Sequence, residues 1–292
     1  MKKFFALSTF LSALTFAAIA TTSAKAETFA TKACDPIQVV IHASYGGGTD
    51  TTARMMSIRS RRTLKADMQI VGKRGGSGAK AQNYTLTRPK DGCTIMALTE
   101  SHLYTMARGK SDMKIDDLVG VARAMEEPTF IVVNAKNKEL STIKKFIKRS
   151  KKKPIVTAIA SIGGTEHIGM YNYSKTADVP FKAVSFGSGA QSLQALASGK
   201  VEASLLNPSE AAALIADKKI KAIVLLHDKA LADYPKVKTS YSMGHKVKVV
   251  TTRGYAVLKG TPQSVIDEIS KGMVKAMKHE TFGNYLKGAS LD

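Results

Sequence analysis

Three consecutive glycines at 46–48, followed by Thr49 and Asp50, form the segment of this sequence best suited to bind an anion. They follow an apolar, β-branched run at 37–43 and precede a helix-like run at 49–64. Glycine lets the backbone come close to a ligand, and the first N–H groups of a helix have no partner within the helix. Phosphate and carboxylate groups both bind to such helix starts. We therefore expect a small anion to bind here, with a purely structural turn as the alternative interpretation.

The side chain of Asp50 has two possible roles beside these glycines. A carboxylate in the first turn can cap the helix, which is favourable at the positive end of the helix dipole. It can also accept a hydrogen bond from a hydroxyl or amide group of a ligand. Both interpretations stay open on sequence alone.

A second segment of similar composition, SIGGTEHIG, lies at 161–169. Ser161, Gly164 and Thr165 would supply hydroxyl and amide donors at the start of another helix. His167 is the weaker candidate, because it is two residues beyond Thr165 and points away from that face of the helix. Two more strand-to-helix junctions, LTESHLY and VSFGSGAQ, carry small polar residues of the same kind.

The sequence lacks motifs for catalysis and for metal binding. The glycine segment has neither the lysine of a P-loop nor the spacing G-x-G-x-x-G. GGSGA at 75–79 comes nearest to the G-x-S-x-G of hydrolases but ends in alanine. We predict a binding protein with no catalytic residues, no metal and no cofactor. A secreted hydrolase that uses Ser77 or Ser161 is the alternative from another class.

Residues 1–26 have the pattern of a cleavable secretory signal peptide. Two lysines precede an apolar stretch at 4–20, and residues 24–26 read Ala-Lys-Ala, an A-x-A cleavage site. An uncleaved membrane anchor is the alternative, but serines and threonines interrupt the apolar stretch. No later stretch reaches the roughly 18 apolar residues of a membrane helix. We expect export to the periplasm.

The chain of 292 residues has a formal net charge of +21. This charge could indicate nucleic-acid binding, but the lysines are scattered apart from short runs within 144–153, and no aromatic RNA-binding motif occurs. A solvated basic face is the better interpretation, and it would steer anionic solutes toward the protein. We predict no nucleic-acid partner.

Strand-like and helix-like runs alternate along the chain. In the first half we predict strands at 37–43, 67–73, 93–99 and 130–135, and helices at 49–64 and 75–88. In the second half we predict helices at 141–153, 163–177, 189–200 and 209–219, strands at 154–161, 181–186, 201–207 and 220–227, a crossing segment at 247–260, and a last helix at 261–279 with Thr261 as N-cap. Such alternation is typical of α/β folds with parallel sheets, whose ligands bind at the carboxyl ends of the strands. Two such units would face each other across a cleft.

The glycine-rich loops, in this order, resemble the solute receptors of tripartite tricarboxylate transporters, called Bug-type receptors. The matching stretches are YGGGTDTTAR (45–54), VGKRGGSGAKAQNY (71–84), PKDGCTIMAL (89–98), SIGGTEHIG (161–169), VSFGSGAQSLQALASGKVEA (184–203), NPSEA (207–211) and GYAVLKGTP (254–262). They extend over nearly the whole chain after residue 26. One departure is Arg253, which precedes Gly254 where an aromatic residue is usual.

The resemblance implies an α/β fold of two lobes, the type II periplasmic binding protein fold, in which each lobe is a mostly parallel sheet flanked by helices. Lobe 1 would comprise 27–130 with 252–292 returning to it, and lobe 2 would comprise 131–251. The implied ligand is a small carboxylate, such as a di- or tricarboxylate, an aromatic acid or an amino acid. A sulfonate or phosphonate is the alternative. The implied partners are the membrane permease subunits of a tripartite tricarboxylate transporter, or a sensor kinase, and the receptor would be a monomer.

The ligand contacts that the resemblance implies lie on the glycine-rich loops of both lobes. In the first loop they are Tyr45, Gly47, Gly48, Thr49 and Asp50, and in the loop that opens the second lobe they are Ser161, Gly164, Thr165 and His167. Ser101, His102, Phe186, Gly187 and Asn207 occupy other junctions along the cleft.

The sequence has two cysteines, Cys34 and Cys93. Disulfides are permitted in an exported protein. In the implied fold the third strand lies beside the first, so Cys34 before strand one and Cys93 at the start of strand three would share one edge of the sheet. We expect a disulfide between them, with two buried free thiols as the alternative.

Overall fold

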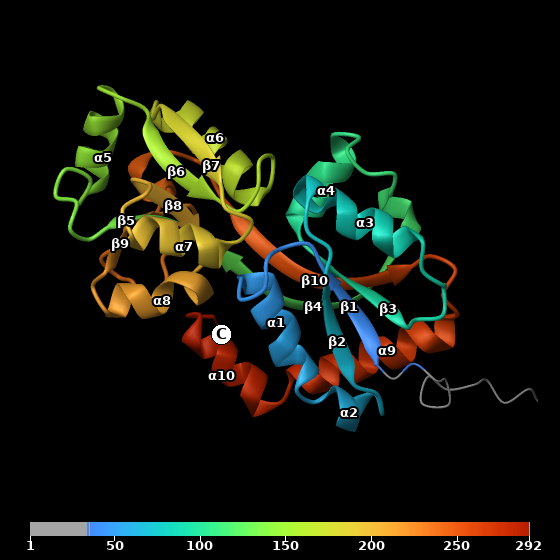
Figure 1. Cartoon of the computed structure of the whole chain (residues 1–292). Coiled ribbons are helices and arrows are strands. Elements are labelled where there is room, and N and C mark those ends of the chain that lie inside the picture. The colour runs from blue at the N-terminus through green and yellow to red at the C-terminus, as the bar shows by residue number, and fades with distance from the viewer. Residues whose placement is uncertain (1–33, 35, 292) are drawn as a thin grey trace, which may run out of the picture.

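The computed structural model describes Cys34 and residues 36–291, so the predicted signal peptide at 1–26 lies outside the described residues. The described chain forms two lobes, each a five-stranded sheet flanked by helices (Figure 1). The α/β class and the two-lobed arrangement predicted from the sequence are confirmed.

Lobe 1 is built on a sheet with the strand order β2-β1-β3-β10-β4. Its strands are β1 (Ile37–Ile41), β2 (Met68–Gly72), β3 (Thr94–Leu98), β4 (Leu118–Pro128) and β10 (Val250–Leu258). Its helices are α1 (Gly48–Ser57), α2 (Ser60–Thr63), α3 (Ala79–Leu86), α4 (Glu100–Ala107), α9 (Gln263–Met277) and α10 (Glu280–Gly288), with the 3-10 turns η2 (Gly76–Gly78) and η3 (Ile115–Asp117). Because β1 is parallel to both β2 and β3, the loops after these strands meet at one edge of the sheet.

Successive side chains of β1 point to opposite faces of the sheet, and helices cover both faces. Ile37, Val39 and Ile41 belong to the core that α1, α9 and α10 complete. Gln38 points to the opposite face, where Tyr84 of α3 donates its hydroxyl hydrogen to Gln38 Oε1 at 2.9 Å.

Lobe 2 is built on a sheet with the strand order β7-β6-β8-β5-β9. Its strands are β5 (Phe130–Asn134), β6 (Ile155–Ile159), β7 (Phe181–Ser185), β8 (Ala203–Leu206) and β9 (Ile220–Leu225). Its helices are α5 (Ile143–Ser150), α6 (Thr165–Ala177), α7 (Gly189–Ala197) and α8 (Pro208–Ala216), with the 3-10 turn η4 (Tyr241–Met243). Alternate residues of β5 belong to two different cores, one on each face of the sheet, which explains its continuous apolar sequence.

Two neighbouring segments connect the lobes. The chain leaves lobe 1 between β4 and β5, and it returns through β10, which lies beside β4 as it runs between the lobes (Figure 1). β10 is antiparallel to β3 and β4, and β5 is antiparallel to β8 and β9. Each of these strands enters its sheet from the other lobe, whereas helical crossovers join the parallel strands. The sequence predicts β5 and β9 as strands, at 130–135 and 220–227, but not that they are antiparallel to each other.

Four local features differ from the sequence prediction, and the first is β4, which matches none of the predicted strands. The predicted helix 49–64 is divided into α1 and α2, and Ser57 Oγ donates to the Ala53 carbonyl at 2.7 Å where α1 ends, a bond that competes with helix continuation. Thr261 is not an N-cap, because its hydroxyl donates to the Leu258 carbonyl and α9 begins after Pro262. The helix α10 is absent from the prediction, and its N-cap is His279, a residue that rarely signals a helix start.

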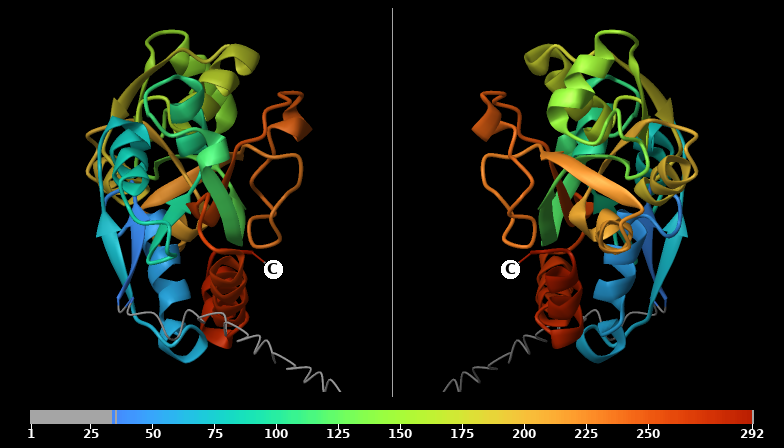
Figure 2. Two further views of the ribbon diagram at one scale, coloured as in Figure 1. Left: turned by 90° about the vertical axis from the view of Figure 1, so that its right-hand side faces the viewer. Right: turned by 90° about the vertical axis from the view of Figure 1, so that its left-hand side faces the viewer.

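The C-terminal helices α9 and α10 pack against lobe 1 beside α1 and α2 (Figure 2). Phe282 of α10 is buried in the lobe 1 core. The hydroxyl groups of Thr52 on α1 and Tyr285 on α10 are 2.8 Å apart. The end of the chain therefore supports the helix that carries the first glycine-rich loop.

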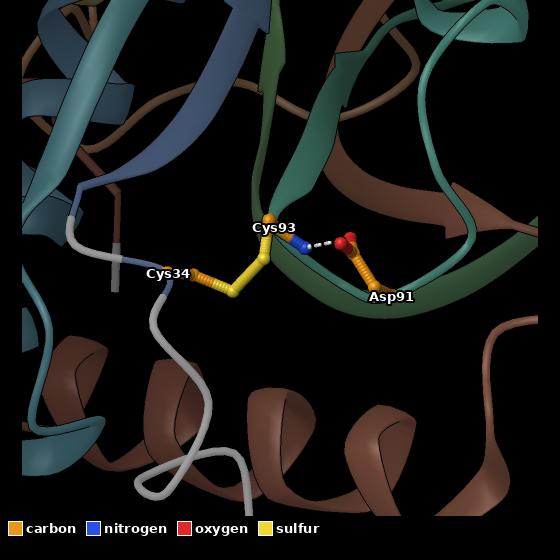
Figure 3. Close-up of a disulfide and its surroundings, with 3 residues drawn as sticks. All are labelled: Cys34, Asp91 and Cys93. Atoms are coloured by element: carbon orange, nitrogen blue, oxygen red, sulfur yellow. Dashed lines mark hydrogen bonds between the residues drawn. A yellow bond between two sulfur atoms is a disulfide. The ribbon is translucent and has the colours of Figure 1, made fainter.

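Cys34 and Cys93 form a disulfide just ahead of β1 and β3, with their Cα atoms 5.4 Å apart (Figure 3). Asp91 holds the same turn, because its Oδ1 accepts a hydrogen bond from the Cys93 N–H at 2.8 Å. The bond joins the amino ends of two neighbouring parallel strands, at the edge of the sheet opposite the strand ends that lead into the glycine-rich loops.

Candidate ligand-binding site

A cavity of about 880 Å³ lies between the two lobes. Its lining comes from the segments that follow the strands of both sheets and from β10, within 42–49, 74–78, 99–101, 160–166, 185–191, 207–210 and 251–253. In α/β proteins the carboxyl ends of parallel strands are where ligands bind, because helix N-termini meet there. The described part of the chain thus places polar loops of both lobes around one space.

The start of α1 is held by Asp50, which does not line the cavity. Asp50 Oδ2 accepts a hydrogen bond from the Gly46 N–H at 2.8 Å, and Asp50 also forms an ion pair with Arg54 one turn later. Gly46 has a positive φ of 80°, a conformation that glycine adopts without strain. Asp50 therefore fixes the glycine segment from within α1.

The N–H of Gly48 donates to a carboxylate of the protein itself. Glu210 Oε1, on α8 of lobe 2, accepts this hydrogen bond at 3.1 Å. Glu210 Oε2 accepts from the Asn207 N–H at 3.2 Å, so Glu210 also completes the capping box of α8. The carboxyl group that meets the start of α1 in this structure therefore comes from the opposite lobe.

The two lobes make further hydrogen bonds around the cavity. Ser101 Oγ on α4 accepts from the Thr165 N–H at the start of α6, at 3.1 Å. Ser44 Oγ donates to Gln191 Oε1 at 3.1 Å, and Ser77 Oγ donates to the Ile162 carbonyl at 2.5 Å. These contacts define a closed arrangement of the lobes.

Arg253 on β10 lies at the centre of a buried polar network. Its guanidinium pairs with Glu127 on β4 at 2.8 Å and donates to Thr49 Oγ1 at 3.1 Å and Asn207 Oδ1 at 3.2 Å. Glu127 is fully buried and also accepts hydrogen bonds from the N–H and hydroxyl of Ser209. A guanidinium can satisfy several acceptors at once, and a buried charge needs such partners. The network links the strands between the lobes to helix starts in both.

Burial shifts the pKa values of several groups in and beside the cavity. Burial, with Glu210 and Glu100 nearby, raises the pKa of Glu166 to about 7. Burial also raises the pKa of Glu210, partly offset by the positive charge of Arg253. Burial and the charge of Arg253 lower the pKa of His42 to about 4, so this imidazole is neutral at pH 7.

The sequence-predicted ligand contacts divide into two groups. Those that line the cavity are Gly47, Gly48, Thr49, Ser101, Ser161, Thr165, Phe186, Gly187 and Asn207. Those that do not line it are Tyr45, Asp50, His102, Gly164 and His167.

The residues of the second group have structural contacts of their own. The hydroxyl of Tyr45, on an exposed side chain, accepts a hydrogen bond from the Gly72 N–H at 3.0 Å. His102 Nδ1 accepts from the Thr99 N–H at 3.1 Å as part of an N-terminal cap, and His167 Nδ1 accepts from the Gly163 N–H at 2.9 Å. Gly164 is packed so closely that a Cβ would collide with Ser161 Oγ.

Several cavity residues were absent from the sequence prediction. Arg74, Glu166, Glu210, Thr251 and Arg253 all contribute to the lining. A signal was available for Glu210, because Asn207 and Glu210 have the spacing of a capping box. The sequence marks Arg253 only as a departure from the family pattern, and no local pattern marks a strand residue as facing a cavity between lobes.

None of the described helices combines the length and apolar character needed to cross a bilayer. No group of His, Cys, Asp and Glu within the described chain is arranged to hold a metal ion.

The two lobes, the paired connecting strands and the polar cavity between them define a two-lobed solute-binding protein. The sequence model of the family "Tripartite tricarboxylate transporter family receptor" matches residues 52–292. The chain therefore belongs to this family, which is a family of solute-binding receptors and not of enzymes.

Relatives and solved structures agree with this assignment. The chain is 24% identical over 253 residues to Protein BugT of Bordetella pertussis, a match that covers 83% of this chain and 76% of BugT. It is similar in structure to the periplasmic binding protein BugD, with a TM-score of 0.82 at 21% identity over 88% of this chain and 87% of BugD. It is also similar to MatC of Rhodopseudomonas palustris with bound malate, with a TM-score of 0.81 at 21% identity over 88% of this chain and 89% of MatC.

Proposed function

We propose that this protein is a periplasmic receptor that captures a small carboxylate in the cavity between its lobes. Membership of the receptor family and the interlobe cavity support this function together. MatC, with bound malate, and an R. palustris protein of similar fold with adipate both bind dicarboxylates. Residues 1–26 serve as the export signal. The partners are the permease subunits of a tripartite tricarboxylate transporter, with a sensor kinase as a further candidate.

The donors for a carboxylate come from both lobes. Ser161, Gly75, Gly76 and Gly189 line the cavity, and backbone N–H groups at helix starts bind anions well. The N–H of Gly187 already donates to the Ala160 carbonyl at 2.9 Å. Arg74 supplies a positive charge at the cavity, and its Nη1 donates to the neutral hydroxyl of Ser44 at 3.3 Å. Arg253 is already paired with Glu127, which leaves Arg74 as the better partner for an incoming carboxylate.

Ligand release requires the lobes to separate. The connecting strands β4 and β10 are adjacent, so a hinge at their lobe 2 ends would open the cavity without disrupting either sheet. The hydrogen bonds between Gly48 and Glu210 and between Ser101 and Thr165 would break on opening. The receptor acts as a monomer, and membership of a family of solute-binding receptors supports a function without chemistry.

A thermal-shift panel tests this function on protein that has been unfolded, dialysed and refolded to remove any carried ligand. Di- and tricarboxylates, aromatic acids and amino acids form one arm, and alkyl sulfonates and phosphonates form the other. A bound ligand raises the melting temperature by mass action. Shifts confined to the sulfonate and phosphonate arm would favour that alternative. Hydrolysis of an ester panel that is lost in the Ser161→Ala variant would overturn the assignment as a receptor.

A further inference from the structure

The cavity contains more carboxyl groups than a site for a simple dicarboxylate should. Glu166 and Glu210 both line it. Glu210 is engaged by the N–H groups of Gly48 and Asn207, so its negative charge is partly compensated. The proposed function gives no role to the carboxyl group of Glu166.

Glu166 lies in the first turn of α6, directly after the second glycine-rich loop. Its carboxyl group accepts a hydrogen bond from its own backbone N–H and from no other described residue. Burial and the nearby Glu210 and Glu100 disfavour the negative charge of Glu166, so its pKa is raised, although its own backbone N–H and Arg253 favour that charge. This side chain therefore faces the cavity with acceptor capacity that the protein does not use.

The cations near the cavity do not compensate Glu166 by direct contact. Arg253 donates to Glu127, Thr49 and Asn207, and Arg74 donates to Ser44. His42 is a poor cation, because burial lowers its pKa to about 4.

Thr251 provides a second, independent indication of a polar ligand group. This residue on β10 lines the cavity and is only 5% exposed, and its Oγ1 has no hydrogen-bond partner within the described structure. A buried hydroxyl without a partner is unfavourable unless a ligand or water completes it.

We propose that the ligand is an aminocarboxylate, whose ammonium group donates hydrogen bonds to the Glu166 carboxylate while the hydroxyl of Thr251 contacts a polar atom of the same ligand. This inference rests on the proposed function, which supplies the carboxylate end of the ligand. Above pH 7, where Glu166 has lost its proton, a second carboxylate in place of the ammonium group would meet Glu166 with like charge. An ammonium group supplies the positive charge and the N–H donors that the site lacks.

Matched pairs of ligands test the role of the amino group. Isothermal titration at pH 8, on refolded protein, compares L-glutamate with glutarate and L-2-aminoadipate with adipate. The members of each pair differ only by the amino group. We expect at least one amino member to bind the wild-type protein about tenfold or more tightly than its partner. In Glu166→Gln this preference should fall to near one, and in Glu166→Asp it should be retained in part. Glu139→Gln, on an exposed side chain, should keep the full preference.

The outcomes separate this inference from the proposed function. If glutarate or adipate binds as tightly as its amino counterpart, the inference is wrong while the receptor function stands. An amino preference that persists in Glu166→Gln would also overturn it. If none of the four acids binds, the inference fails, and failure of the whole carboxylate panel would remove the proposed function as well. Circular dichroism and thermal melting of each variant show that loss of preference is not loss of folding.

Discussion

Arg253 on β10 and Glu127 on β4 form an ion pair of 2.8 Å between the two strands that connect the lobes. Both side chains are buried, at 5% and 0% exposure. Arg253 also reaches Thr49 of lobe 1 and Asn207 of lobe 2. The pair therefore sets the positions of two helix starts relative to the connecting strands.

Replacement of Arg253 by methionine should lower the free energy of unfolding by about 3–5 kcal/mol, because it leaves the Glu127 carboxylate buried without a charge partner. Urea denaturation measures the loss. The double variant Glu127→Gln/Arg253→Met should recover a large part of it, because no isolated charge then remains. A loss below about 1 kcal/mol in the single variant would mean that water or another group compensates Glu127.

Alanine at Gly48 should weaken ligand binding by about tenfold or more, equivalent to about 1.4 kcal/mol. The added Cβ would collide with the guanidinium of Arg253 and lie 3.1 Å from Glu210 Oε1. Because Glu127 holds Arg253 in place, the start of α1 would have to move away from lobe 2. Gly120→Ala is the matched control, since a Cβ there meets nothing within 4 Å. Equal affinities for the two variants would show that closure does not need this close approach.

Removal of the positive charge of Arg74 by glutamine should slow association and weaken the binding of the carboxylate ligand by about tenfold at low ionic strength. The effect should shrink as salt rises, because the side chain is exposed and screened. Surface plasmon resonance at two salt concentrations measures the association rate and the affinity. Arg62→Gln, on the exposed side of α2, removes one charge far from the cavity lining and should leave the kinetics nearly unchanged. Unchanged binding in Arg74→Gln would show that groups other than Arg74 bind the carboxylate of the ligand.

The raised pKa of Glu166 predicts a pH-dependent gain in stability for Glu166→Gln. Because the folded protein holds a proton on Glu166 up to about pH 7, while the unfolded chain loses it near pH 4.5, wild-type stability from this group is lost as pH rises through that window. The ligand-free variant should match the wild type at pH 4.5 and exceed it by up to about 3 kcal/mol at pH 8. Denaturation at a series of pH values measures the difference.

The comparison of Glu166→Gln with the wild type also cancels the effect of His42 on the free energy of unfolding, which has the opposite pH dependence. Its pKa of about 4 makes both proteins lose stability as pH falls from 6.5 toward 4. Since both carry His42, only the difference between them reports on Glu166. A difference that stays constant with pH would contradict the raised pKa.

Loss of the disulfide should destabilise the protein without changing its ligand affinity. Cys34 and Cys93 are 59 residues apart, and closure of a loop of that length contributes about 4 kcal/mol in the chain-entropy model. Cys34→Ser/Cys93→Ser should lower the free energy of unfolding by that amount, and wild-type protein treated with dithiothreitol should behave alike. Binding should persist, because the bond lies at the opposite edge of the sheet from the cavity. A large loss of affinity would show that the sheet transmits strain to the site.

The sequence predicts the α/β fold well because each parallel strand and its helix form a local pattern. Ile37, Val39 and Ile41 have the alternating spacing of strand side chains that share one face of a sheet. The antiparallel strands β5 and β10 are different, since their direction is set by the lobe from which they enter. That information lies in the tertiary arrangement and not in any short segment.

The candidate site shows the same limit. Glycine-rich helix starts can be read from sequence because their chemistry is local, and Gly47, Gly48 and Thr165 indeed line the cavity. Glu210 and Arg253 are distant in sequence from those loops and reach them only when both lobes are assembled. Asp50 has a role that the sequence analysis does not name: it makes no cap hydrogen bond at α1 but accepts one from the Gly46 N–H.

The bond between Cys34 and Cys93 has a mechanical consequence. A pulling force applied to the chain ahead of Cys34 would pass through a covalent link straight into β3, an inner strand of the lobe 1 sheet. Without that link, the same force would first peel β1 away from β2 and β3, one hydrogen bond after another. The oxidised receptor should therefore withstand traction on its leading segment far better than the reduced one.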